Sequence, residues 1–390
     1  MDSLNLSSSE AGDKYVMLFA DCVPVKGATS SAIYDLTRHA ISTFPSEYYP
    51  LFELFRAHLL GQIFAMFAEQ DRENLCEFLQ FLHSSEYMML VQDPAAFPAM
   101  SSRFDPAHVV SHAVIDVNTE HHDYRKIVGE IDALRCAHLQ IRSYSMLFGL
   151  EDLEELAHLC HGTSILTLDA LLAHEPERCD DDYAAVVRDN RILSGLAVHS
   201  ANGERTIRVD YGLTGSSAEL VAATITVTPK QLGSHFDCGT IGRADLLQPS
   251  TPGFNELRAF NGCLNGKVAI DERGQIRNCP AMARGFGDHR QTALADVVTS
   301  IAFQGPWHYR KDDIEVCRDY QYRYACADCR AFVDKPGNEE TSKPLKCGYD
   351  PYSDSWSDWR TRPSSVATMR DYRRRVHLPV VSSRTRGCGE

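Results

Sequence analysis

A cysteine-flanked segment in the last third of the chain reads Cys263-Leu-Asn-Gly-Lys-Val-Ala-Ile-Asp-Glu-Arg-Gly274-Gln-Ile-Arg-Asn-Cys279. Short apolar runs lie on either side of residues 271–274, which are of turn-forming types, and this pattern predicts a β-hairpin. Because a hairpin folds back on itself, we expect it to bring the sulfur atoms of Cys263 and Cys279 toward each other. The segment therefore predicts a pair of thiols held by one hairpin.

Cysteines are concentrated around this hairpin. Of the 13 cysteines in the 390 residues, seven lie between residues 238 and 347: Cys238, Cys263, Cys279, Cys317, Cys326, Cys329 and Cys347. Clustered cysteines in a cytosolic protein usually indicate metal or redox chemistry, because disulfides seldom persist there. The five scattered before them are expected to be small buried hydrophobes, namely Cys22, Cys76, Cys136, Cys160 and Cys179.

Charge and composition narrow the class of protein. The 39 basic residues are outnumbered by 53 acidic residues, which gives a net charge of −14 and argues against a nucleic-acid partner. No apolar run approaches the roughly 18 residues of a membrane span, so no membrane partner is expected. The N-terminus lacks the basic start and apolar stretch of a secretory signal. These features predict a cytoplasmic protein.

The middle of the chain alternates between strand and helix patterns. Strands are predicted at 112–117, 136–141, 164–168, 192–200, 206–211 and 222–228, and helices at 123–134 and 150–158. Repeated βα units predict an α/β fold with a largely parallel sheet, here a degenerate, partial (β/α) barrel. In such sheets the chemistry lies at the carboxyl ends of the strands. Asp116 is the one carboxylate that this argument offers for catalysis, and a loop-capping role is its alternative.

Five segments follow from these patterns. They are a disordered end (1–13), a small winged-helix-like α+β element (14–95), a partial βα barrel (104–236), a cysteine-rich domain (237–356) and a polar, Arg-rich tail (357–390). The element at 14–95 is predicted from strands followed by helical patterns at 51–67 and 71–82. It either binds the leader segment of a peptide by strand addition or simply packs on the barrel.

The cysteine spacing resembles that of the SPASM domain, which ends many peptide-modifying radical S-adenosylmethionine enzymes and holds auxiliary 4Fe-4S clusters. The matching residues are Gly274, Cys279, Cys317, Cys326 and Cys347, with Cys329 one residue early. Tyr320 stands where the pattern has a cysteine. From about residue 14 to Trp356 the chain is similar to the SPASM-domain maturases of grasp-with-spasm peptide systems. That similarity implies an iron–sulfur protein that helps to mature a ribosomally made precursor peptide beside an ATP-grasp peptide ligase.

The resemblance also implies two ligand sets. Cys263, Cys279 and Cys329 would hold one cluster, with Cys238 as a fourth ligand. Cys317, Cys326 and Cys347 would hold another, in which Tyr320 leaves a position open or differently filled. Thiolates are the soft ligands that iron–sulfur clusters require. Two alternatives stay open at this point: zinc held by the same cysteines in a non-catalytic scaffold or leader-peptide adaptor, and a region that has lost its metal.

One motif of the radical enzymes is absent. Their Cys-x3-Cys-x2-Cys loop follows the first barrel strand, but residues 118–124 contain no cysteine. S-adenosylmethionine is therefore not an expected cofactor, and whether the chain catalyses a step is left open. Among the histidines, His121 and His122 are expected at a solvated helix start, and His158 and His161 in a structural role.

Overall fold

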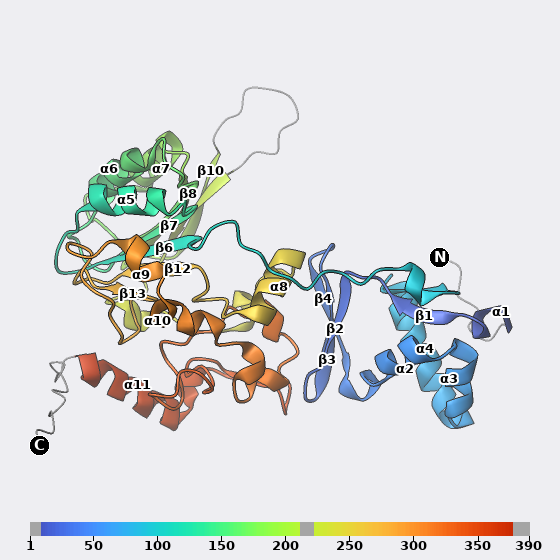
Figure 1. Ribbon diagram of the computed structural model, residues 1–390. Helices are drawn as coiled ribbons and strands as arrows, with labels where there is room; N and C mark the ends of the chain where they lie inside the picture. The colour runs from blue at the N-terminus through green and yellow to red at the C-terminus, as the bar shows by residue number, and fades with distance from the viewer. Residues whose placement is uncertain (1–8, 211–221, 377–390) are drawn as a thin grey trace, which may run out of the picture.

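The computed structural model describes residues 9–210 and 222–376 (Figure 1). The N-terminal unit lies at one end, the large sheet with its helices at the other, and the cysteine-rich segment beneath that sheet. Most of the expected disordered end (1–8), the last part of the expected tail (377–390) and Cys388 lie outside the described residues. Residues 9–12 form a short helix in which Ala11 is buried, so the expectation of a disordered end is wrong for this part.

The N-terminal unit combines two small antiparallel sheets with helices. Its elements are α1 (Ser9–Gly12), β1 (Tyr15–Leu18), β2 (Cys22–Val25), β3 (Ser30–Asp35), β4 (Ala40–Pro45), α2 (Leu51–Ala57), α3 (Leu60–Met66), α4 (Glu69–Ser84) and β5 (Met88–Val91). The helix expected at 51–67 is interrupted, because His58 and Leu59 adopt extended backbone conformations. The winged-helix-like interpretation stays a prediction.

The central elements follow the predicted alternation closely. They are β6 (His112–Val117), α5 (Tyr124–Ala133), β7 (His138–Ser143), α6 (Leu150–Cys160), β8 (Thr167–Ala173), α7 (Asp180–Asp189), β9 (Leu193–His199), β10 (Arg205–Asp210) and β11 (Ala222–Val227). Helices α5, α6 and α7 lie side by side on the sheet (Figure 1), and their apolar side chains form the main core with the strands. Each helix returns the chain so that the next strand can pair in parallel. The α/β class is therefore confirmed.

The large sheet has the strand order β10-β11-β9-β8-β7-β6-β12-β13. Pairing is parallel from β11 through β12 and antiparallel at the two ends. The carboxyl ends of β6 and β7 therefore lie at the same edge, where Asp116 is paired with Arg142 in the register of the two strands. The partial barrel stays a prediction.

The predicted hairpin exists, and it extends the sheet. Strands β12 (Lys267–Ile270) and β13 (Ile276–Arg277) pair antiparallel around the turn at 271–274, where Gly274 has a φ of +81°. In addition, β12 pairs in parallel with β6, from Lys267 beside His112 to Ile270 beside Ile115. This pairing satisfies the backbone groups along that side of β6 and fixes the cysteine-flanked hairpin to the sheet.

The rest of the cysteine-rich segment has few regular elements. Its helices and strands are α8 (Thr251–Ala259), α9 (Leu294–Val298), α10 (Ile301–Gln304), β14 (Tyr349–Asp350), β15 (Ser355–Trp356) and α11 (Pro363–Val376). Short 3-10 helices include His235–Asp237, Lys311–Asp313, Cys317–Asp319 and Arg323–Ala325. The N-terminal unit packs against this segment, because the buried hydroxyl of Tyr34 donates a hydrogen bond to the Gln321 carbonyl at 3.0 Å.

Helix α11 differs from the expected polar tail. Its Met369 is buried against Phe332 and Leu345, so an apolar contact holds the helix to the cysteine-rich segment. Within residues 9–210 and 222–376, none of the helices combines the length and apolar character that crossing a bilayer requires.

Candidate functional site

Four cysteines from separate loops form the first thiol group: Cys238, Cys263, Cys279 and Cys329. Burial is the main cause that raises the pKa of the Cys329 thiol, and together with the neighbouring thiols of the other three it brings this pKa to about 12. Burial likewise raises the pKa of Cys279 to about 11, although Lys267 opposes the shift. Cys238 is exposed, whereas the other three are partly covered. The structure therefore places these four predicted ligands within electrostatic range of one another.

Lys267 supplies the positive charge of the first thiol group. Its ammonium nitrogen lies 3.1 Å from the Cys263 sulfur. Burial alone lowers the pKa of Lys267, but the thiols of Cys263, Cys279 and Cys238 outweigh this effect, so the pKa is raised overall. A buried ammonium requires a nearby negative charge, which a thiolate supplies. The first residue of β12 thus lowers the pKa of the Cys279 thiol against the effect of burial.

Gly239 holds the Cys238 loop against Cys329. Its φ of +82° lies in the left-handed region, and a Cβ atom at this position would be 2.8 Å from the Cys329 sulfur. Such a distance is shorter than van der Waals contact allows. Only glycine therefore lets the backbone beside Cys238 approach this thiol so closely.

We expect Gly239→Ala to destabilise the protein more than Gly203→Ala does. Both glycines have positive φ, so each alanine carries a backbone cost of about 1–2 kcal/mol. Only the Cβ at position 239 meets the Cys329 sulfur, because nothing lies within 4 Å of one at Gly203. Thermal unfolding of the two variants measures the difference, and equal losses would show that the approach to Cys329 has no energetic consequence.

The second thiol group consists of Cys317, Cys326 and Cys347, all of which are buried. The Lys311 ammonium lies 3.3 Å from the Cys326 sulfur. Burial raises the pKa of Cys317 to about 12, Lys311 opposes the shift, and Asp328 and Cys347 add to it. The structure therefore gathers the three remaining predicted ligands around a second lysine, which is buried.

Strained backbone flanks the second thiol group. Val316, directly before Cys317, has a φ of +67°, which is unfavourable for a β-branched residue. Asp328, between Cys326 and Cys329, has a φ of +63°. The Asp328 carboxylate is fully buried and bridges Lys311 at 3.3 Å and Arg330 at 2.7 Å. Strain of this kind persists where surrounding contacts over-determine the backbone, and it is common at functional sites.

Tyr320 faces the second thiol group in place of the cysteine of the SPASM pattern. Burial raises the pKa of its phenol well above the ordinary value, and the nearby thiols of Cys326 and Cys347 add to this effect. Its hydroxyl is buried and has no hydrogen-bond partner among the described residues. A buried hydroxyl without a partner costs free energy. The fourth position of this group therefore contains a polar atom that is available to a ligand.

Asp116 belongs to a buried polar trio at the carboxyl edge of the sheet. Its carboxylate accepts a hydrogen bond from Arg142 Nε at 2.6 Å and contacts the Tyr144 hydroxyl at 3.5 Å. Burial raises the pKa of Asp116 to about 6, although Arg142 lowers it. Arg142 Nη2 is buried and unpartnered in the described part of the chain. The loop-capping alternative does not account for this ion pair, which spans two neighbouring strands.

The trio lies beside the first thiol group. Cys238 acts on the pKa of both Arg142 and Tyr144, and Cys279 acts on that of Tyr144. The sequence argument missed Arg142 and Tyr144. The sequence did contain a signal for them. Both residues follow the predicted strand at 136–141, and Asp116 lies near the end of the predicted strand at 112–117. Because neighbouring parallel strands end at the same edge of a sheet, the three side chains could have been expected there. An unused guanidinium nitrogen at this edge can bind an anionic or carbonyl group.

Other predicted residues have mixed outcomes. The expectation of buried cysteines is confirmed for Cys22, Cys136 and Cys160, whereas it is wrong for Cys179, which is exposed, and Cys76 is only partly buried. His122 is not solvated: it is buried, and its Nε2 lies 2.9 Å from the Asp116 carbonyl oxygen. The loop at 118–123 therefore folds back on β6.

The thiol groups are not preassembled metal sites. Within residues 9–210 and 222–376, no group of three or more His, Cys, Asp or Glu side chains is arranged so that it could hold a metal ion. Each group is defined by burial, by electrostatic contact and by its lysine.

Comparisons with known proteins add little. No family model matches the chain, and no curated protein matches it. Two crystal structures of SuiB from Streptococcus suis are similar over 86% and 85% of this chain and 100% of theirs. The structure bound to the precursor peptide SuiA has 9% identity and a TM-score of 0.30, and the one bound to S-adenosylmethionine has 10% and 0.32. A likeness of this size carries no conclusion about function.

Proposed function

We propose that the chain is an iron–sulfur protein that helps to mature a ribosomally made peptide together with an ATP-grasp ligase. The observation that carries the proposal is the division of seven cysteines into two groups, each with a lysine nitrogen within 3.3 Å of a sulfur. These are the same two sets that the resemblance to the SPASM domain implies. The cysteine-rich domain (237–356) would hold the clusters, and the βα unit (104–236) would support them.

The donor chemistry of both groups fits 4Fe-4S clusters. Thiolates are the ligands such clusters use, and Lys267 and Lys311 offset the negative charge that several thiolates bring into a buried site. The raised pKa values of the buried thiols mean that these thiols are costly to ionise without metal, so metal binding would release their protons. The cluster would supply electron transfer or Lewis acidity. The residues of this chain would bind and orient the peptide.

A cavity beside the first thiol group offers room for part of a peptide. Its volume is about 490 Å³. It is lined by Pro280 and Arg330, which follow Cys279 and Cys329 in the chain, and by Phe332 and Tyr309. Charged groups of both signs, among them Glu272 and Arg277, also line it. Such a mixture of apolar and polar groups is typical of peptide and small-molecule sites.

Tyr320 provides a test of the second cluster. We expect Tyr320→Cys to restore the Cys-x2-Cys spacing with Cys317 and to change the electron paramagnetic resonance signal of the reduced protein. Tyr320→Phe, which removes only the hydroxyl, is the matched control and should leave the iron content unchanged. If both variants gave the wild-type signal and iron content, Tyr320 would not adjoin a cluster.

Co-expression tests the peptide role. Where a ligase gene and a short-peptide gene adjoin the gene for this chain, they would be expressed with and without it, and the peptide product would be analysed by mass spectrometry. We expect a product that depends on this chain and is lost in the Cys279→Ala variant. A product identical in mass and yield without the chain would contradict the proposal. If the Cys279→Ala variant supported full yield, the alternative of a leader-peptide adaptor would replace the proposal.

A further inference from the structure

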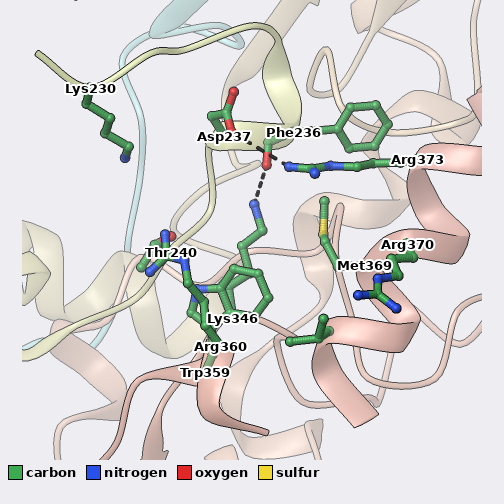
Figure 2. A pocket seen from close by; sticks show the side chains of 11 residues that line it. Lys230, Phe236, Asp237, Thr240, Lys346, Trp359, Arg360, Met369, Arg370 and Arg373 are labelled. Carbon is green, nitrogen blue, oxygen red and sulfur yellow. Dashed lines mark hydrogen bonds and ion pairs between the residues drawn. The ribbon is translucent and has the colours of Figure 1, made fainter. Parts of the chain in front are cut away.

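A strongly cationic pocket lies between α11 and the loop that carries Cys238 (Figure 2). Its volume is about 360 Å³. Its lining contains a single acidic residue, Asp237, and five basic ones: Lys230, Lys346, Arg360, Arg370 and Arg373. The whole chain has a net charge of −14, so this concentration of positive charge is local and opposite in sign. Such a patch attracts anions that the remaining surface repels.

Most of this charge is not neutralised by ion pairs. Arg373 and Asp237 are 3.9 Å apart, at the limit of an ion pair, and Arg360 contacts the exposed Asp358 at 3.4 Å. Among the described residues, no acidic side chain pairs with Arg370 or Lys230. The pocket therefore retains guanidinium groups that can form charge-assisted hydrogen bonds with a carboxylate.

The floor of the pocket is apolar and connects to the first thiol group. Trp359, Phe236 and Met369 line it beside the cations. The Lys346 ammonium lies 5.7 Å from the Trp359 ring centre. It donates one hydrogen bond to the Phe236 carbonyl (Figure 2) and another to the Cys238 carbonyl. The Trp359 indole nitrogen is buried without a hydrogen-bond partner in the described part. A ligand in this pocket would thus lie beside Lys346, whose ammonium contacts the Cys238 backbone of the first thiol group.

We propose that this pocket binds an acidic peptide segment that combines carboxylates with apolar side chains. The cations match the carboxylates, and the aromatic floor matches aliphatic or aromatic neighbours in the segment, which a free phosphate would not use. The inference rests on the proposed function for the peptide nature of the ligand. The binding test below is separate from metal analysis, so the two can fail independently.

Fluorescence anisotropy of the full-length protein measures the binding. The probe is a labelled synthetic peptide of Glu, Asp and Leu, and its twin carries Gln and Asn in place of the acids. We expect the acidic peptide alone to bind, and Arg370→Gln combined with Arg373→Gln to weaken binding by about tenfold or more. Arg374→Gln is the matched control, because Arg374 is exposed on the same helix, pairs with Asp371 and does not line the pocket; its affinity should change by less than about twofold.

Three outcomes would overturn the inference. They are equal binding of the acidic peptide and its amide twin, equal losses in the double variant and Arg374→Gln, and displacement of the peptide by inorganic phosphate that itself binds more tightly. Iron content measured on the same samples tests the cluster proposal separately from the pocket inference. Iron present without peptide binding rejects only the pocket inference.

Discussion

Cys279→Ala is expected to remove one whole cluster, about four irons per chain, and to leave the other in place. Cys263, Cys238 and Lys267 all act on the pKa of Cys279, which places its thiol near all three. The substitution removes the sulfur at the end of the hairpin from the first thiol group. Cys317→Ala is expected to remove the iron of the second thiol group instead. Retention of one cluster by each variant shows that both proteins are folded.

Cys160→Ala is the control for the cysteine variants. Cys160 is buried in the main core on α6, and burial raises its pKa to about 12, but it belongs to neither thiol group. Iron and sulfide analysis of all three anaerobically purified proteins measures the effect. Equal iron content in the Cys160, Cys279 and Cys317 variants would rule out both groups as cluster sites.

Arg142→Met is expected to destabilise the fold by about 3–5 kcal/mol, because it leaves the Asp116 carboxylate buried without its partner. The two groups are almost fully buried, with side-chain exposures of 10% for Arg142 and 1% for Asp116. Chemical unfolding measures the loss. Arg208→Met on β10 is the control, since Arg208 pairs with Asp210 at the surface, and such exposed pairs contribute about 0–1 kcal/mol.

The loss in Arg142→Met should also depend on pH. Burial already raises the pKa of Asp116 to about 6, and Arg142 acts to lower it, so removal of Arg142 raises this pKa further. A carboxyl group with a raised pKa in the folded state loses stabilising free energy as the pH increases from about 3.9, its unfolded value, through the folded value. The destabilisation should therefore be larger at about pH 8 than at about pH 5. If the loss of unfolding free energy did not depend on pH, the ionised Asp116 carboxylate would not be its cause.

Local patterns predicted much of the fold. The strand at 112–117 and the hairpin around residues 271–274 have the expected bounds, because alternating apolar residues and turn chemistry act over a few residues. The pairing of β12 with β6 could not be predicted, since it joins segments about 150 residues apart and depends on an unpaired strand edge. The break at His58 follows from tertiary contacts of the same kind, because the Leu60 amide bonds to the Lys14 carbonyl.

The cysteines of the two thiol groups could be predicted from the sequence, but the lysines that lie beside them could not. The resemblance to the SPASM domain implied that Cys263, Cys279 and Cys329 belong to one group, and they lie within electrostatic range of one another. Lys267 and Lys311 carry no motif, and their role depends on burial that only the fold reveals. The segment after Trp356 was expected to be a polar tail because arginines dominate its composition. A single buried methionine, Met369, holds α11 in place, and one apolar residue gives no periodic pattern.

The metal content of the anaerobically purified full-length protein tests the central claim most directly. Iron, acid-labile sulfide and zinc would be measured per chain, together with the visible absorption spectrum. The two thiol groups predict a brown protein with about four or about eight irons, an equal amount of sulfide and little zinc. A colourless protein with about one or two zinc ions per chain, or with no metal, would contradict the account.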